Sequence, residues 1–340
     1  MTTITTTAEL AAFCNELKGQ PFIAVDTEFM RETTYWPKLC LIQVASPDTE
    51  SCIDPLAEGI DLEPLLDILR DPSVLKVFHA ARQDVEIFNN LNAMPTPLFD
   101  TQVAGMAAGF GEQIAYDALV RQMLKIELDK SSRFTDWARR PLSDAQLTYA
   151  VADVTHLATL FPILRDRLEK AGRLAWVEEE MKALNDPAAY DVDPEKAWRR
   201  LRPRKTAAKY LAVFKAVAAW RERTAQTRDQ PRGRILKDEA IDELATQAPT
   251  SLEGLNTLRS VPKGFGGSKF GPDLLAAIKA ALADPEGYAP VLEKSGPPPP
   301  ASAGAVVELL KVLLKARAEE AGVASKLIEA ITAAMERGAP

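Results

Sequence analysis

The chain has 340 residues, of which 46% are hydrophobic and 26% are charged. These values are ordinary for packed domains and exclude a disordered or collagen-like chain, while the length favours two domains with a smaller third element. The net charge of −7 has the opposite sign from that of a simple nucleic-acid-binding domain.

The three cysteines, Cys14, Cys40 and Cys52, are odd in number and lack a Cys-x-x-Cys spacing. This pattern argues against structural disulfides and zinc. The sequence has no run of 18 apolar residues, and its first ten residues lack the basic and apolar regions of a secretion signal. We therefore expect a soluble, cytoplasmic, monomeric protein that has no membrane partner.

The first half of the chain predicts strands mixed with helices. Strands are expected where apolar and β-branched residues lie between polar turns, at PFIAVDTEF, LCLIQVAS, ESCID and LKVF. Helices are expected at residues 62–69, 80–91, 101–109 and 116–124. Ser143 and Gln146 have the spacing of a capping box, which predicts a long helix that ends near residue 171. These elements predict an α/β layered domain over residues 1–185.

After residue 185 the pattern changes. DPAAYDVDPEKAW breaks the helical periodicity with two prolines, so a linker is expected at 186–205. Helical periodicity at 205–223, 237–247, 251–255 and 272–283 predicts an all-α domain over 206–285.

A second linker is expected at residues 286–304, which include SGPPPPASAG. The C-terminal segment, 305–340, predicts two amphipathic helices, VVELLKVLLKARAEEAG and SKLIEAITAAMERG. Two helices are too few for a core of their own, so we expect them to dock on another part of the protein.

Charge is segregated along the chain. Between Lys196 and Lys237 there are 14 basic residues and two acidic ones, a local charge of +12 that leaves −19 on the rest. A solvated helix face would explain such a run. The interleaved aromatic residues favour a surface that contacts phosphates instead, although some of them must belong to the core; they are Trp198, Tyr210, Phe214 and Trp220.

Asp26 and Glu28 lie two residues apart on a predicted strand, so their side chains share one face while Thr27 points to the other. Carboxylates this close repel each other unless a cation neutralises them, and the pair is therefore half of a possible metal site. A solvated strand end is the structural alternative.

Asp84, Tyr149 and Asp153 extend this set. Asp84 lies in the first turn of a predicted helix, where complementing the helix dipole is an equally good explanation. Tyr149 and Asp153 share one helix face, so Asp153 could bind a metal while Tyr149 orients water; a half-buried aromatic residue is the alternative for Tyr149. The joint occurrence of four carboxylates and a tyrosine predicts a metal-dependent nuclease.

Four segments resemble the motifs of the DEDD superfamily of exonucleases, most closely the ribonuclease D family. They are AVDTEFMRETTYWPKLCLIQVA, VFHAARQDVEIF, FDTQVAGM and LDKSSRFTDWARRPLSDAQLTYAVADV. The superfamily has either Tyr four residues before the last Asp or His five residues before it, so Tyr149 and Thr148 indicate the tyrosine subclass. The resemblance covers about residues 20–175. It implies a ribonuclease-H-like fold, a mixed sheet flanked by helices, and hydrolysis of RNA from its 3′ end to nucleoside 5′-monophosphates.

The resemblance also implies two divalent cations, Mg²⁺ or Mn²⁺. Asp26 would contact both ions, Glu28 and Asp153 would complete the first site, Asp84 would hold the second largely through water, and Tyr149 would position the nucleophile. One ion lowers the pKa of bound water and the other stabilises the departing oxygen, so no histidine base is required. His79 and His156 are the only histidines; we expect structural or rim positions for both, and they do not support a serine–histidine triad.

Candidate substrate contacts follow from position. They are Thr27, Phe29, Met30, Gln43, His79, Lys130, Arg139 and Arg140. Gln43 and the basic residues suit phosphate or ribose, with ordinary surface or ion-pair roles equally open. Phe29 and Met30 could pack on the terminal base or belong to the core.

Residues 206–283, which include QPRGRILKDEAIDELA, resemble an HRDC domain, a small helical nucleic-acid-binding module. This resemblance implies phosphate contacts at Arg232, Arg234 and Lys237. Residues 306–340 look like only part of a second such module.

The sequence therefore predicts an exoribonuclease that trims the 3′ ends of structured RNA, such as tRNA precursors, while the basic module grips the folded part. A DNA exonuclease of the same superfamily stays open, because metal ions read phosphate rather than the sugar. A non-catalytic RNA-binding scaffold is the other alternative, although it would have no chemical reason to keep four repelling carboxylates together.

Overall fold

The computed structural model describes the chain except for residues 1–2, 130, 134, 293–302 and 326–340. The described residues form two units. The first unit contains the chain up to Met30, then Leu39–Tyr190, and the helix that follows the Pro-rich segment. The second contains Arg31–Lys38 together with the segment that begins at Asp191. The sequence had placed residues 31–38 entirely with the α/β domain, whereas their contacts belong to the helical unit.

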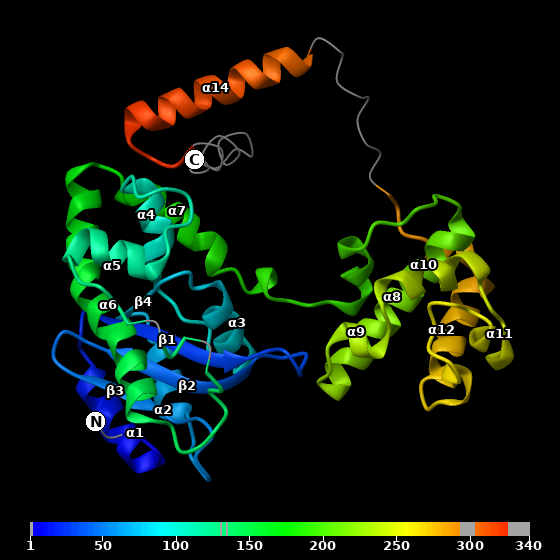
Figure 1. Ribbon diagram of the computed structural model, residues 1–340, viewed down its shortest axis with the longest axis horizontal. Coiled ribbons are helices and arrows are strands. Elements are labelled where there is room, and N and C mark those ends of the chain that lie inside the picture. Colours follow the sequence, from blue (N-terminus) through cyan, green and yellow to red (C-terminus); the bar gives the residue numbers. More distant parts are fainter. Residues whose placement is uncertain (1–2, 130, 134, 293–302, 326–340) are drawn as a thin grey trace. The chain divides into compact units, whose positions relative to one another are not determined.

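A five-stranded sheet forms the centre of the first unit (Figure 1). β2 pairs with β3 in antiparallel fashion, whereas β1 pairs with β4 and β4 with β5 in parallel, so the predicted mixed sheet is confirmed. The strands, in the spatial order β3-β2-β1-β4-β5, are β1 (Phe22–Met30), β2 (Lys38–Ala45), β3 (Glu50–Ile53), β4 (Leu75–Phe78) and β5 (Leu98–Asp100).

Seven α-helices surround this sheet in the first unit: α1 (Thr7–Leu17), α2 (Glu63–Arg70), α3 (Arg82–Asn90), α4 (Thr101–Ala107), α5 (Tyr116–Leu124), α6 (Asp144–Lys170) and α7 (Leu174–Leu184). A short 3-10 turn, η1 (Pro187–Ala189), follows them. The three cysteines are buried and form no disulfide. Helices α1 and α7 and strand β5 are additions to the sequence-based expectation.

Helix α6 begins as predicted. The Ser143 side chain accepts a hydrogen bond from the Gln146 backbone, and the Gln146 side chain accepts one from the Ser143 backbone. By length and composition alone α6 could cross a membrane. In this structure it packs on β1, β3 and β4, and most of its buried residues, such as Leu157, belong to the main core.

The second unit is helical and is built around α8 (Ala208–Arg228), which packs against α10, α12 and the 3-10 helix η2. The remaining elements are η2 (Pro194–Arg200), α9 (Arg232–Ile235), α10 (Asp238–Gln247), α11 (Leu252–Asn256), η3 (Phe265–Gly267), α12 (Gly271–Ala283) and α13 (Pro285–Tyr288). Tyr210, Phe214 and Trp220 are buried in its core, and Trp198 packs against them. The expectation that these aromatic residues mark a phosphate-contacting surface is therefore wrong.

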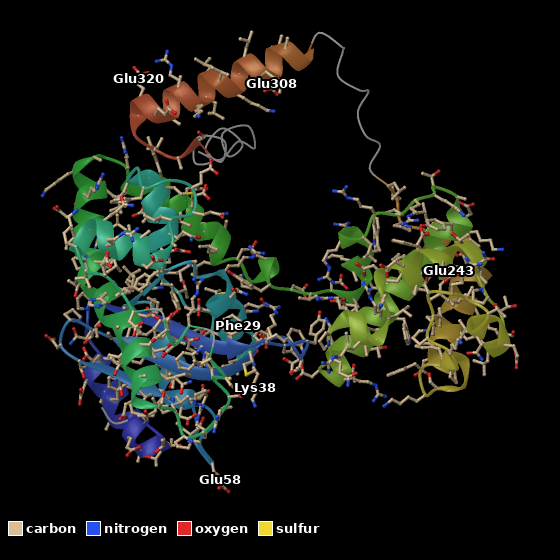
Figure 2. All side chains as sticks on the ribbon, viewed as in Figure 1. Phe29, Lys38, Glu58, Glu243, Glu308 and Glu320 are labelled. Carbon is tan, nitrogen blue, oxygen red and sulfur yellow. The ribbon has the colours of Figure 1, made fainter. Side chains whose placement is uncertain are left out.

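The C-terminal helix α14 (Ala303–Ala321) is attached to the first unit by its last turn. The Arg173 guanidinium donates to the carbonyls of Ala321 and Gly322, and the Ala324 amide donates to the Met106 carbonyl at 3.0 Å. Figure 2 shows Glu308 and Glu320 projecting from this helix. The second predicted C-terminal helix lies outside the described residues, apart from its first residue.

Candidate active site

A cavity of about 520 Å³ opens beside the second half of β1. Its walls come from β1, from the segments that precede α5 and α6, and from α6 itself. Residues that the sequence singled out and that line this cavity are Asp26, Thr27, Glu28, Phe29, His79, Tyr149 and Asp153. The structure thus brings residues from distant parts of the chain into one place.

The first half of strand β1 is buried in the core and its second half borders the cavity, so two carboxylates of this strand lie at the cavity. Its first residues, Phe22–Val25, are buried in the core, whereas Asp26 and Glu28 face the cavity. Burial raises the pKa of Asp26, and the nearby Asp153 raises it further. Burial, followed by repulsion from Asp26, Asp153 and Asp84, raises the pKa of Glu28 to about 9, while Arg133 opposes the rise. Both carboxyl groups therefore lack sufficient positive charge nearby.

The turn before α3 brings Asp84 close to Asp26 and Glu28, although Asp84 does not itself line the cavity. Ala80 has a φ of 58°, a left-handed conformation that is uncommon for alanine. The Asp100 carboxylate holds this turn, because it accepts hydrogen bonds from the backbone of Ala80 and Ala81, each at 2.9 Å. α3 starts directly afterwards with Asp84 in its first turn.

Asp84 is not a solvated helix-capping residue. Its side chain is only 6% exposed, and it accepts hydrogen bonds from the Thr27 hydroxyl at 2.5 Å and from its own backbone amide. Burial raises the pKa of Asp84, and Asp26 raises it further. Complementing the helix dipole alone would not require this burial beside another carboxylate.

Helix α6 supplies the remaining pair. The Tyr149 hydroxyl is hydrogen-bonded to Asp153. Burial raises the pKa of Asp153 to about 7, although the hydrogen bond from Tyr149 and the charge of Arg133 both lower it. Burial also raises the pKa of Tyr149, so at neutral pH it remains a protonated hydrogen-bond donor. The Trp137 ring lies with its centroid 6.1 Å from that of Tyr149 and closes one side of this residue.

The donor set fits a hard divalent cation. Among the described residues, no three Asp, Glu, His or Cys side chains already form a metal-binding group, so the fit rests on the chemistry of the donors. Four carboxylates in one buried region raise one another's pKa, and a bound cation would remove that repulsion. Oxygen ligands of this kind suit Mg²⁺ or Mn²⁺.

Three further candidate substrate contacts lie on the sheet, and each has a structural role. The Thr27 hydroxyl is committed to Asp84. Met30 packs in the small apolar cluster that contains Cys40 and Trp137, so its core alternative holds. Gln43 is 0% exposed and has no hydrogen-bond partner within the part of the chain that is described, and the expectation that it contacts substrate is wrong.

The two histidines lie where the sequence placed them, at structural or rim positions. His79 lines the cavity, but its Nδ1 is 3.0 Å from the Thr101 hydroxyl and its Nε2 is 3.1 Å from the Ile114 carbonyl oxygen. Burial lowers the pKa of His79 and of His156. The expected substrate contact of His79 stays a prediction, although both of its ring nitrogens already have protein partners.

The basic residues before α6 differ from expectation. Arg140 binds Asp54 through two hydrogen bonds of 2.6 and 2.7 Å and also donates to the carbonyls of Cys40 and Trp137, so the ion-pair alternative holds for this residue. Arg139 is exposed but does not line the cavity, and Lys130 lies outside the described residues. Arg133, which the sequence analysis missed, does line the cavity. No local pattern distinguishes Arg133 from its neighbours, because its position depends on the path of the loop.

Much of the basic segment is neutralised within the helical unit. Seven of its 14 basic residues form ion pairs with carboxylates: Lys196, Arg200, Arg204, Lys215, Arg221, Arg223 and Arg232. The predicted phosphate contact of Arg232 is wrong, since its guanidinium binds the buried Glu222. Arg234 and Lys237 are exposed and line a shallow hollow with Arg259.

Comparisons with known proteins agree with this division. Residues 1–169 match the family model of the 3′-5′ exonuclease domain, and residues 210–278 match that of the HRDC domain. The fold and the carboxylate pocket thus define a 3′-5′ exonuclease with an HRDC domain.

Known proteins that are similar over nearly the whole chain identify the family within this class of exonucleases. The chain is 52% identical to ribonuclease D of Nitrobacter hamburgensis, covering 97% of this chain and 86% of that protein, and 50% identical to ribonuclease D of Granulibacter bethesdensis, covering 96% and 83%. The crystal structure of Escherichia coli RNase D, described as an exoribonuclease involved in structured RNA processing, matches with a TM-score of 0.83 and 33% identity, covering 96% and 86%. The chain belongs to the ribonuclease D family and is a 3′-5′ exoribonuclease.

Proposed function

We propose that this exoribonuclease trims the 3′ ends of structured RNA, such as tRNA precursors, by two-metal-ion hydrolysis that releases nucleoside 5′-monophosphates. The observation that carries the proposal is the meeting of Asp26, Glu28, Asp84 and Asp153, all with raised pKa values, beside Tyr149. The similarity to an enzyme of structured RNA processing in Escherichia coli supports the class of substrate.

Asp26, Glu28, Asp84 and Asp153 would hold two Mg²⁺ or Mn²⁺ ions. When bound, such a pair activates water and stabilises the charge on the departing 3′ oxygen. The Tyr149 phenol, which stays protonated, orients the attacking water next to Asp153. Thr27 fixes the rotamer of Asp84 through its hydroxyl.

Two further side chains at the cavity suit the RNA. Arg133 brings a positive charge to the wall that faces Glu28 and Asp153, where it can attract the scissile phosphate. Phe29 presents an aromatic surface on which the 3′-terminal base can stack. Both interactions are sequence-independent, as trimming of different 3′ ends requires.

The helical unit would contribute backbone contacts through a small set of residues. Arg234, Lys237 and Arg259 line one exposed hollow, and their charge suits the phosphates of folded RNA. Because half of the basic segment is already paired with carboxylates, we assign this role to the hollow rather than to the whole segment.

A cleavage assay tests the proposal. The purified chain is incubated with tRNA that carries a 3′ extension, in Mg²⁺ or Mn²⁺ and with or without chelator, and Asp26→Ala serves as the blank. We expect stepwise release of nucleoside 5′-monophosphates that stops at the folded part and is abolished by chelator. Matched DNA strands are tested beside the RNA. Equal or faster digestion of DNA, or chelator-insensitive cleavage, would overturn the proposal.

A further inference from the structure

The connection between β1 and β2 leaves the nuclease unit. The chain passes from Met30 at the end of β1 into Arg31–Lys38, which belongs to the helical unit, and rejoins the first unit at Leu39, the second residue of β2. Figure 2 labels Phe29 near the end of β1 and Lys38 at the start of β2, on either side of this connection. Arg31 is only three residues after Glu28. The helical unit therefore holds the direct continuation of the strand that carries two pocket carboxylates.

Tyr35 is the side chain by which this connection is held. It is 6% exposed, and its hydroxyl donates to the Glu222 carboxylate. The same oxygen accepts hydrogen bonds from Arg232 at 2.8 Å and from Gln226 at 3.3 Å. The Arg232 guanidinium also lies 4.5 Å above the centroid of the Tyr35 ring.

Glu222 is the buried hydrogen-bond acceptor for Tyr35 and is itself held by two arginines. Its side chain is completely buried, and it binds Arg232 through two hydrogen bonds of 2.7 and 2.6 Å and Arg200 at 2.8 Å. Burial alone would raise the pKa of Glu222, but the hydrogen bonds from Arg232, Tyr35 and Arg200 lower it to about 2. The acceptor is therefore ionised throughout the neutral range.

Asp229 holds the backbone of the same connection. Its carboxylate accepts hydrogen bonds from the amides of Tyr35 and Trp36, at 3.0 and 2.9 Å. Asp229 ends α8 in a left-handed conformation with a φ of 47°, which aims the carboxylate at these two amides. Trp36 adds an edge-to-face contact with Tyr35, at a centroid distance of 4.7 Å, and packs against the core of the helical unit.

We infer that Tyr35 and Asp229 are positioning residues for the exonuclease reaction. By fixing the connection at its middle, they restrict the end of β1 and thereby keep Glu28 and Phe29 in place at the cavity. The helical unit then contributes to the chemical step as well as to RNA binding. This inference rests on the proposal that the carboxylate pocket is the catalytic site.

The test measures kcat, KM and the Mg²⁺ concentration for half-maximal rate on a short single-stranded RNA, with the full chain. Tyr35→Phe removes the hydroxyl, and Asp229→Ala removes the backbone acceptor. For each we expect about a tenfold fall in kcat and a higher Mg²⁺ requirement with little change in KM, since loss of a residue that orients metal ligands costs about 10- to 100-fold. Asp229→Asn keeps an acceptor oxygen and tolerates a positive φ, so it should remain near the wild-type kcat.

Tyr210→Phe is the matched control. Tyr210 is similarly buried in the helical unit and donates its hydroxyl to Asp242 at 2.6 Å, and its hydroxyl also accepts from the Arg204 amide; neither partner belongs to residues 31–38. All variants are compared below their melting temperatures, so that unfolded protein does not lower the measured kcat. Wild-type kcat and Mg²⁺ dependence in both Tyr35→Phe and Asp229→Ala, or an equal loss in Tyr210→Phe, would overturn the inference alone. An inactive wild-type chain would instead overturn the proposed function.

Discussion

The nuclease unit contains a cluster of four buried carboxylates, whereas the helical unit contains the closed cluster, in which the single buried carboxylate of Glu222 is paired with Arg200 and Arg232. The two clusters differ in how their charge is balanced. In the helical unit Glu222 is enclosed by Arg200, Arg232 and Tyr35, and its pKa falls to about 2. In the nuclease unit burial, followed by repulsion from three other carboxylates, raises the pKa of Glu28 to about 9.

This difference separates a structural carboxylate from functional ones. The charge of Glu222 is satisfied by groups within the protein, so the cluster needs nothing from outside. The pocket carboxylates repel one another, and Arg133 is the basic residue that opposes them within the described part of the chain. A group of buried carboxylates short of positive charge indicates a binding site for a cation.

The largest effect is expected from Asp26→Asn. In the proposed two-metal mechanism Asp26 is a ligand of both ions, and its loss would remove several kcal/mol of transition-state stabilisation, so kcat should fall by about 10³-fold or more. In chelator the variant should melt at the same temperature as wild type or higher, because one repelling charge is gone. The measurements are mononucleotide release and thermal melting.

Asp117→Asn is the control for this change, because Asp117 lines the same cavity but does not raise the pKa of any of the four carboxylates. Its activity should stay within a few-fold of wild type. If Asp26→Asn kept more than a tenth of wild-type activity, the pocket carboxylates would not be distinguished from Glu222 as functional groups.

Tyr149→Phe is expected to have the next largest effect. The ring and its packing on Trp137 remain, but the hydroxyl that orients water is lost, so kcat should fall by about 10²-fold. The Mg²⁺ concentration for half-maximal rate should change little, since phenylalanine leaves all four carboxylates intact. A variant with full kcat would show that the hydroxyl only supports Asp153.

Glu222→Gln tests the closed cluster. The quantity measured is the free energy of unfolding, because this cluster is not expected to bind a metal ion. Removal of the charge leaves Arg200 and Arg232 uncompensated, but both are partly exposed, so we expect a loss of about 2 kcal/mol in the free energy of unfolding. Divalent cations should not restore it. Chemical denaturation with and without Mg²⁺ measures both quantities.

The same variant has a pH signature. The pKa of Glu222 is lowered from 4.5 to about 2 in the folded chain, so its contribution is present above pH 4.5 and is lost as the pH falls towards 2. Wild type should lose stability through this range faster than Glu222→Gln. Parallel curves for the two proteins would show that the charge of Glu222 contributes nothing.

The smallest effect is expected outside both clusters. Arg234→Ala and Lys237→Ala should each weaken binding of structured RNA at low salt and reduce the slope of log affinity against log salt by about 1. Activity on short RNA should be unchanged. Arg232→Ala, by contrast, should act on stability, because its guanidinium is bound to Glu222.

Local patterns predicted the main elements and the two halves of the site that are close in sequence. The D-x-E spacing on β1 and the i, i+4 spacing of Tyr149 and Asp153 depend only on strand and helix geometry, and these pairs lie together in the structure. Strand β5 has three residues, too few for periodicity to show. The first helix, α1, did carry a signal that was missed, the capping box of Thr6 and Glu9.

Side-chain partners were harder to predict, because they depend on residues distant in sequence. Arg140 is hydrogen-bonded to Asp54, which is 86 positions away in the sequence, and Arg232 is hydrogen-bonded to Tyr35, which is 197 positions away. Basic character alone cannot distinguish such ion pairs from phosphate contacts. The membership of residues 31–38 in the helical unit is likewise invisible until the fold brings Tyr35 to Glu222.

The central claim is that the pocket carboxylates bind divalent cations which the closed cluster does not need. Anomalous diffraction from crystals of the full chain soaked in Mn²⁺ tests it most directly. We predict two peaks, separated by about 4 Å, among Asp26, Glu28, Asp84 and Asp153, and none at Glu222. A crystal of active enzyme with no manganese at these four residues would contradict the account.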